Sequence, residues 1–338
     1  MRVTSKRLIP ISLILVLLIG SFFILKYFLP HLPYPSVDKQ RAALNNKPFV
    51  TPFRVLDSAQ IVDDLKFLSS DSCEGRGPGT NGHTLAMERI VIRMREARLD
   101  SFNSSLIQNF LGYPHYYSIS GLTQYTKKGQ NIIGWIKGTE YPEKYVVISA
   151  HYDHLGIREG KIYHGASDNA SGTACLLAMA KYFKQHPLKY SLIFAAFDRE
   201  ESMMEGSKNF IANPPLDLSS IKFNLNIDMI TRNDSNEIFA CGVYHYPSLK
   251  YLVTETQNKT NSKLLMGHDK KNSDDPRYDW TGLSDHLPFY QKEIPFLYIG
   301  TEDHPDYHQP TDTWDKTNLI TYIENCNMIV LIAQILKL

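Results

Sequence analysis

Residues 145–153 read Tyr145-Val-Val-Ile-Ser-Ala-His151-Tyr-Asp153, a run of β-branched and aromatic residues that leads into a histidine and an aspartate. Two similar runs lead into acidic residues, Leu192-Ile-Phe-Ala-Ala-Phe-Asp-Arg-Glu200-Glu201 and Phe223-Asn-Leu-Asn-Ile-Asp228-Met229. Short, continuously apolar runs are typical of strands buried on both faces of a parallel sheet. Because ligand sites of such sheets lie at the carboxyl ends of the strands, we expect these polar side chains to gather at one edge.

Helix signals separate these strands along the chain. Asp57 or Ser58 can cap a helix that runs to Leu68, and Thr80 can cap the next helix. We also predict a long helix over 170–183, a closing amphipathic helix over 318–336, and strands over 132–136 and 294–299. Strands that alternate with helices predict one α/β domain, with a mixed, mostly parallel central sheet and helices on both faces.

The composition is that of an ordinary globular protein. The 338 residues are 43% hydrophobic and 21% charged, which excludes a disordered chain and a polytopic membrane protein. Lys plus Arg number 36 against 35 for Asp plus Glu, so the chain lacks the basic excess that drives nucleic-acid binding. Four cysteines are too few for a disulfide framework.

The first 29 residues differ from the rest, because they hold four basic residues and no acidic one. Residues 8–25 carry no charge and as a helix would span about 27 Å, close to the ~30 Å hydrocarbon core of a bilayer. Basic residues precede this run, and no small-residue cleavage site follows it. We therefore predict an uncleaved membrane anchor in residues 1–29, with a cleaved export signal or a buried helix as alternatives.

Prolines interrupt residues 30–55 without any apolar periodicity, which predicts an extended tether between the anchor and the domain. The folded domain is then expected over 56–338. An anchor with its basic end in the cytoplasm places that domain outside the cytoplasm, in the periplasm or the extracellular space. Cleavage of the first segment would instead release a secreted protein.

Two polar loops add to the residues at the strand ends: His164-Gly-Ala-Ser-Asp168-Asn-Ala-Ser-Gly172 and His304-Pro-Asp-Tyr307-His308-Gln-Pro-Thr-Asp312. Each polar residue alone has a simpler interpretation, such as a helix cap for Asp168 or a solvated turn for the Glu200–Glu201 pair. Together they supply two histidines and three carboxylates on separate elements. Nitrogen and oxygen ligands of this number exceed what one tetrahedral zinc ion needs, and they suit two zinc ions that share a carboxylate.

The chain resembles the di-zinc aminopeptidases of the bacterial leucyl aminopeptidase and aminopeptidase S/Y family. The resemblance covers roughly residues 56–325 and is carried, in the family's order, by the blocks at 68–80, 149–154, 165–172, 198–207, 226–229, 284–286 and 307–312. Arg199 and Gln309 depart from the pattern, since small residues are common at both positions in the family. Neither is a metal ligand there.

The resemblance implies a role for each matching residue. His151 and Asp228 would bind one zinc ion, Glu201 and His308 the other, and Asp168 would bridge both. Glu200 would be the general base, Asp153 would orient the His151 ring, and Tyr307 could donate to the tetrahedral oxyanion. The peptide bond between Asp168 and Asn169 is expected to be cis, as in the family.

The implied activity is hydrolysis of the N-terminal residue from peptides with a free N-terminus, by a metal-activated bridging water. Two alternatives stay open. Glutaminyl cyclases are related and keep much the same ligands, although they resemble one another in a tryptophan just before the last histidine, where this chain has Tyr307. A non-catalytic binding ectodomain on the same fold is the other alternative, but such relatives typically lose ligands or the base, and this chain keeps them all.

Overall fold

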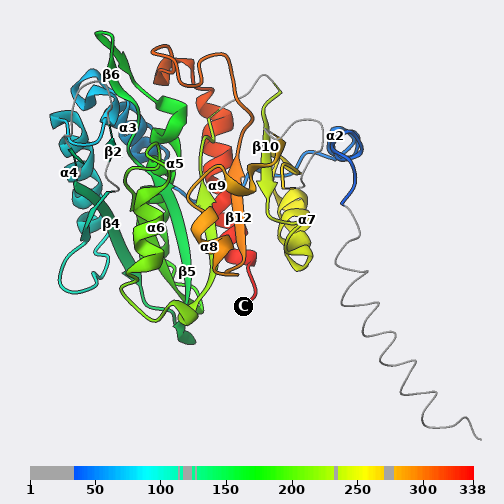
Figure 1. Cartoon of the computed structure of the whole chain (residues 1–338). Coiled ribbons are helices and arrows are strands. Elements are labelled where there is room, and N and C mark those ends of the chain that lie inside the picture. Colours follow the sequence, from blue (N-terminus) through cyan, green and yellow to red (C-terminus); the bar gives the residue numbers. More distant parts are fainter. Residues whose placement is uncertain (1–33, 113–114, 117–123, 126–127, 232–234, 270–277) are drawn as a thin grey trace, which may run out of the picture.

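An eight-stranded sheet runs through the middle of the molecule (Figure 1). The computed structural model describes residues 34–112, 115–116, 124–125, 128–231, 235–269 and 278–338. Across the sheet the strands are β1 (Ile107–Leu111), β4 (Lys128–Ile136), β8 (Tyr190–Phe197), β5 (Tyr141–His151), β9 (Ile221–Ile227), β12 (Phe296–Gly300), β10 (Glu237–Cys241) and β11 (Lys263–Met266). Two small two-stranded sheets pair β2 (His115–Tyr116) with β3 (Gln124–Tyr125) and β6 (Gly156–Arg158) with β7 (Lys161–Tyr163).

The centre of the sheet is parallel. β5 runs parallel to both of its neighbours, β8 and β9, and β12 runs parallel to β9. The outer strands are more varied, since β4 is antiparallel to β8 and to β1, and β10 is antiparallel to β12. The predicted mixed, mostly parallel sheet is therefore confirmed. Its parallel centre brings the carboxyl ends of β8, β5 and β9 to one edge.

Helices cover both faces of the sheet, as predicted. Alternate residues of β5 point to opposite cores, so that Val146 and Ile148 pack in one and Val147 in the other. The larger core includes residues of α3 (Ser58–Leu68), α4 (Asn81–Glu96), α5 (Ser171–Gln185), α7 (Lys250–Lys259) and α9 (Leu319–Ile335). The smaller core is closed by Phe210 of α6 (Glu205–Ala212) and Phe289 of α8 (Leu287–Gln291).

Short helical turns connect several of these elements. They are η2 (Asp71–Arg76), η3 (Ala166–Ala170), η4 (Leu218–Ser220), η5 (Pro247–Leu249), η7 (Trp280–Gly282) and η8 (Trp314–Lys316). The two predicted helix caps are confirmed. The Asp57 carboxylate accepts from the Gln60 N–H at the start of α3, and the Thr80 hydroxyl accepts from the His83 N–H at the start of α4.

The last helix, α9, differs from its prediction. It was expected to be amphipathic, but most of its residues from Tyr322 to Ala333 are buried. The reason lies in its neighbours, since α9 contacts both α3 and α7. A helix between two others buries its whole circumference, so the polar face of an ordinary surface helix is missing.

The predicted extended tether is wrong for residues 37–45, which form helix α2 (Val37–Asn45) beside the sheet (Figure 1). The buried Gln40 side chain donates to the Met266 carbonyl and accepts from the Met266 N–H, both at 2.8 Å. Arg41 pairs with Glu237 of β10. The segment thus attaches through polar side chains that satisfy main-chain groups of the edge strand β11, which explains why no apolar period marks it.

The predicted membrane anchor at 8–25 lies outside the described residues. Among the helices that the structure describes, none is both long enough and apolar enough to cross a membrane.

Candidate metal centre

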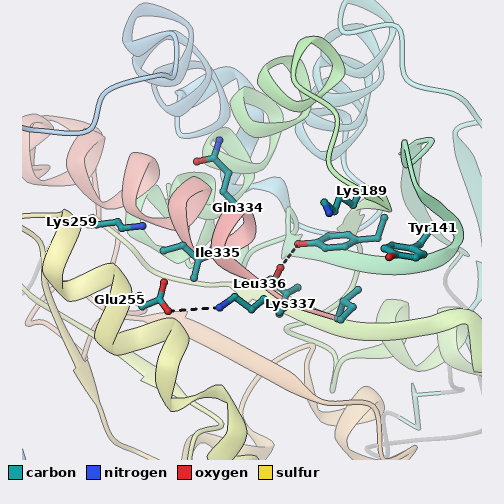
Figure 2. Close-up of a pocket in the computed structure, with 10 residues that line it drawn as sticks. Tyr141, Lys189, Glu255, Lys259, Gln334, Ile335, Leu336 and Lys337 are labelled. Carbon is teal, nitrogen blue, oxygen red and sulfur yellow. Dashed lines mark hydrogen bonds and ion pairs between the residues drawn. The ribbon is translucent and has the colours of Figure 1, made fainter.

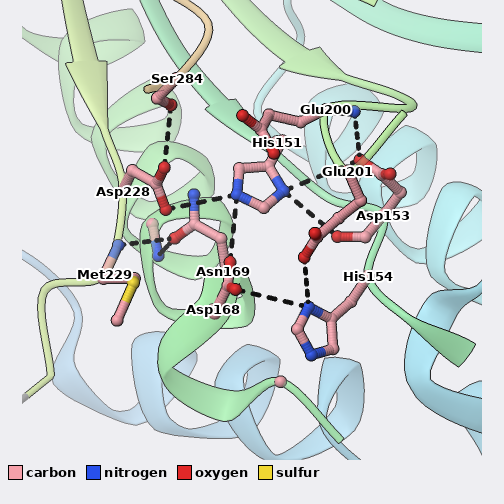
Figure 3. Close-up of polar contacts among 12 residues, drawn as sticks. His151, Asp153, His154, Asp168, Asn169, Glu200, Glu201, Asp228, Met229 and Ser284 are labelled. Carbon is pink, nitrogen blue, oxygen red and sulfur yellow. Dashed lines mark hydrogen bonds and ion pairs between the residues drawn. The ribbon is translucent and has the colours of Figure 1, made fainter. Parts of the chain in front are cut away.

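The predicted site residues meet at the carboxyl edge of the parallel strands (Figure 3). His151 is the last residue of β5 and Asp228 follows β9 directly, while Glu200 and Glu201 lie in the turn after β8. Asp168 comes from the turn before α5, and His308 from the loop between β12 and α9. Residues far apart in the sequence therefore form one cluster.

Asp168 lies in the middle of this cluster. Its Oδ1 is 3.3 Å from His151 Nε2, which is itself 3.3 Å from Asp228 Oδ1. Its other oxygen, Oδ2, is 3.0 Å from His308 Nε2, which lies 3.4 Å from Glu201 Oε1. The two oxygens of one carboxylate thus face two separate groups of donor atoms, which is the arrangement that a bridging ligand requires.

A residue without a predicted role joins the second group. His154 Nδ1 lies 2.8 Å from Glu201 Oε1 and 3.6 Å from Asp168 Oδ2. The sequence did contain a signal, since His154 closes the block 149–154 that carries the family resemblance. Nothing local to that block distinguishes a histidine facing the cluster from one facing away, and the family's ligand set does not include it.

The donor atoms fit zinc. Four tetrahedral ligands at about 2.0–2.1 Å from a zinc ion lie about 3.3–3.4 Å from one another. The distances within the two groups run from 2.8 to 3.6 Å. Two candidate sets result, His151–Asp168–Asp228 and His154–Asp168–Glu201, with His308 beside the second. All donors are imidazole nitrogens or carboxylate oxygens, which suits zinc.

Hydrogen bonds hold the turn that carries Asp168. The Asp168–Asn169 peptide bond is cis, as expected from the resemblance. The Asn169 side chain donates to the Ile227 carbonyl and accepts from the Gly172 and Met229 N–H groups, which ties the turn to the end of β9. The buried Asp312 carboxylate accepts from the N–H groups of Ser167 and Asp168.

A chain of buried side chains orients Asp228. Asn224 donates to the Ser149 hydroxyl, which donates to the Asn226 side-chain oxygen. Asn226 in turn donates to Ser284, whose hydroxyl donates to Asp228 Oδ2 at 2.8 Å. This chain leaves Oδ1 of Asp228 directed at His151, and partners of this kind fix the orientation of metal-binding side chains.

Asp153 lies between His151 and Glu200. The His151 Nδ1 atom is 3.2 Å from the backbone oxygen of Asp153 and 3.7 Å from its carboxylate. The carboxylate accepts from the Glu200 N–H at 2.9 Å. Asp153 therefore contacts the His151 ring mainly through its main chain, and its side chain holds the turn that carries Glu200 and Glu201.

The protein groups alone already form a cluster of opposite charges. Burial lowers the pKa of His308, but the Asp168 and Glu201 carboxylates raise it by more, to about 10. Burial and the Asp168 charge raise the pKa of Glu201, but His154 and His308 lower it by more, to about 2. Burial and the neighbouring carboxylates, Asp285 among them, raise the pKa of Glu200 against the opposing effect of His151.

A small cleft of about 70 Å³ opens over these residues. Carboxylates and imidazoles line its floor, while Met229, Trp280 and Leu283 add apolar surface and Tyr307 stands beside His308 with the two rings stacked. A larger cavity has a volume of about 500 Å³. Figure 2 shows the residues that line it. Tyr141 and Tyr190 line it at the beginnings of β5 and β8, so it lies at the opposite edge of the sheet and outside the cluster.

Comparison with known proteins agrees with this geometry. The sequence profile of Peptidase family M28 matches residues 131–333. Aminopeptidase YwaD of Bacillus subtilis is 29% identical over 195 residues, which are 54% of this chain and 39% of that protein. A probable zinc metalloprotease of Pyrenophora teres f. teres is 27% identical over 150 residues, 41% of this chain and 30% of that protein. The chain spans less than half the length of these curated relatives.

Solved structures share the fold. A leucine aminopeptidase precursor from Bacteroides thetaiotaomicron has a TM-score of 0.66 at 18% identity, covering 85% of this chain and all of that one. A glutaminyl cyclase from the same organism, bound to N-acetylhistamine, has a TM-score of 0.65 at 18% identity, covering 86% of this chain and all of that one. BSAP, a zinc aminopeptidase from Bacillus subtilis, scores 0.62 at 18% identity over 84% of this chain and 95% of its own. At this identity the likeness is one of fold.

Proposed function

Since the chain belongs to peptidase family M28, we propose that it is a zinc-dependent aminopeptidase that removes the N-terminal residue from peptides. The observation that carries this proposal is the placement of Asp168, whose two carboxylate oxygens face two separate sets of nitrogen and oxygen donors. His151 and Asp228 complete one set, and Glu201 and His308 belong to the other. Two zinc ions held there would acidify a bound water and polarise a scissile carbonyl.

Glu200 is proposed as the general base. It lines the cleft, and the Asp153 carboxylate holds its backbone N–H. Burial is the largest cause of its raised pKa, which brings the carboxyl group toward the range in which a side chain can both accept a proton and return it to a leaving amine. Tyr307, from the same cleft, is proposed to donate its hydroxyl to the oxyanion.

The cleft favours a free amino terminus. A peptide's terminal amine is cationic, and the cleft is also lined by Asp303, a carboxylate outside the two donor sets. Because Met229, Trp280 and Leu283 are apolar, we expect substrates with apolar N-terminal side chains to be cleaved fastest.

The test is a panel of aminoacyl-chromogenic substrates, assayed with and without a chelator. Hydrolysis that the chelator abolishes and zinc restores is the expected result. The panel includes a peptide with N-terminal glutamine, analysed by mass spectrometry. Loss of ammonia from that peptide without release of an amino acid, together with no hydrolysis elsewhere in the panel, identifies a glutaminyl cyclase instead. No turnover of any substrate by the zinc-loaded protein points to a non-catalytic binding domain.

We further propose that residues 8–25 anchor the protein in a membrane, with the catalytic domain outside the cytoplasm. The support is the 18 uncharged residues preceded by Arg2, Lys6 and Arg7. N-terminal sequencing of the mature protein, combined with membrane fractionation, tests this. A mature chain that begins after residue 25 and is found in the soluble fraction contradicts the anchor.

A further inference from the structure

The two donor sets of the metal centre are unequal. His151, Asp168 and Asp228 make up the first set. The second set contains His154, Asp168 and Glu201, and the His308 Nε2 atom lies 3.0 and 3.4 Å from the same two carboxylate oxygens. The second position is therefore surrounded by four protein side chains and the first by three.

In the second set, two imidazole nitrogens approach the same pair of carboxylate oxygens. His154 Nδ1 and His308 Nε2 both approach Glu201 Oε1 and Asp168 Oδ2, at distances between 2.8 and 3.6 Å. The two imidazole rings are tilted by 60° with their centroids 5.8 Å apart, so the nitrogens come from different directions. These four imidazole–carboxylate separations are close to the distance between two ligands of a tetrahedral zinc ion, about 3.3–3.4 Å.

The surroundings of His154 direct its Nδ1 atom at the second set. The side chain is fully buried, and its Nε2 atom has no hydrogen-bond partner among the described residues. Among the described residues, the ring's polar contacts through Nδ1 are with the two carboxylates of the set. Gly165 makes the room, because a Cβ there would lie 2.4 Å from His154 Cδ2. The ring is placed by packing and points its one paired nitrogen at the cluster.

We propose that His154 is a metal ligand, so that His154, Asp168, Glu201 and His308 bind one zinc ion with four protein groups while the other ion has three. This inference rests on the proposed two-zinc function. Zinc sites with four protein ligands are closed, whereas sites with three keep a position for water or substrate. The two ions should therefore bind with unequal affinity, and the exchangeable position belongs to the set of His151, Asp168 and Asp228.

Two substitutions separate a ligand from a hydrogen-bond donor. Asn in His154→Asn places an amide N–H near the position of Nδ1, so it can still donate to Glu201 but is a poor zinc ligand. Asp in His154→Asp places a carboxylate there, which can bind zinc but cannot donate. His186→Asn, at the exposed end of α5, is the matched control. Zinc content after dialysis, zinc affinity by competition with a chromophoric chelator, and the visible spectrum of the cobalt-substituted protein are measured for each.

The parent protein should bind two ions of different affinity. Loss of a group that only hydrogen-bonds to a metal ligand lowers metal affinity by ~10–100-fold. His154→Asn should lower the affinity for the tighter zinc ion by more than this, and it should change the cobalt spectrum. His154→Asp should lose less affinity than His154→Asn, and His186→Asn should match the parent.

The inference is overturned if the parent binds two ions and His154→Asn keeps both within a few-fold of the parental affinity, because His154 is then only a partner of Glu201. Equal losses in His154→Asn and His154→Asp overturn it as well. In both cases the proposed function stands. If the parent protein binds fewer than two zinc ions in excess zinc, the two-zinc function itself is contradicted. The results for the two variants do not bear on that function.

Discussion

The guanidinium of Arg76 donates to the backbone carbonyl of Asp168, with 3.2 Å between Nη2 and O. The same buried side chain donates to four more carbonyls, those of Leu68, Tyr152, His164 and Gly165. Arg76 therefore joins the residue after His151 to the turn that carries Asp168. Its acceptors belong to the main chain, so the rigid fork of five donors matches five fixed oxygens.

Replacement of Arg76 by lysine should therefore weaken both the fold and metal binding. An ammonium offers three N–H donors for five carbonyls, and each buried group left without a partner costs about 1–3 kcal/mol. We expect Arg76→Lys to unfold at lower denaturant concentration and to hold zinc less tightly. Arg95→Lys, on the exposed side of α4, is the control. Identical unfolding curves and zinc contents for Arg76→Lys and the parent contradict this role.

The adjacent glutamates should respond differently to the same change. Glu200→Gln should keep its zinc and its stability but lose about 10²–10⁴-fold in turnover, as expected for removal of a general base. Glu201→Gln should lose zinc, because Glu201 Oε1 lies within 3.4 Å of both His154 and His308. Metal analysis and turnover are measured on the same preparations. A Glu200→Gln rate within a few-fold of the parent rules out the proposed base.

Asp285 should make stability depend on pH. It is fully buried, and burial together with Asp153 and Asp228 raises its pKa to about 7 against the opposing effect of His151. A carboxyl group whose pKa is raised in the folded state destabilises the fold as pH rises from its unfolded value, near 4, through 7. Asp285→Asn should thus gain stability relative to the parent at pH 8 but not at pH 4.

The pKa shift of Asp285 sets an upper limit on the stability that Asp285→Asn can gain. One pKa unit corresponds to about 1.4 kcal/mol, so a shift from 3.8 to about 7 allows up to about 4 kcal/mol. Urea unfolding of parent and variant at both pH values, with zinc removed from each, measures it. If the free energies of unfolding of parent and variant differ by the same amount at both pH values, Asp285 does not titrate in this range.

Removal of residues 34–55 should expose the edge of the sheet. The Gln40 side chain satisfies both main-chain groups of Met266 on β11, and an unpaired edge strand is a template for association. A chain that begins at Leu56 should therefore unfold at lower temperature than one that begins at Tyr34, and it should associate. Gln40→Ala should also lower the unfolding temperature and promote association, but by less than the truncation does. Light scattering and thermal unfolding detect both, and equal behaviour of the two chains contradicts a docked segment.

Much of the fold follows from short-range patterns. The helix starts at Asp57 and Thr80 were predicted because capping involves residues within a single turn. The strands that end near His151 and Asp228 were predicted because buried parallel strands are continuously apolar. Since parallel strands end at a common edge, the sequence alone also indicated that His151, Glu201 and Asp228 would meet there.

Only the tertiary structure decided the features that depend on neighbours distant in the chain. α2 is bound by polar contacts to β11, more than two hundred residues away, and such contacts leave no local period. α9 is buried over most of its length, because it packs against both α3 and α7. His154 faces the second donor set because packing beside Gly165 directs its ring there. Backbone propensity is local, whereas the direction and partners of a side chain depend on elements that fold against it, and the ligand geometry depends on both.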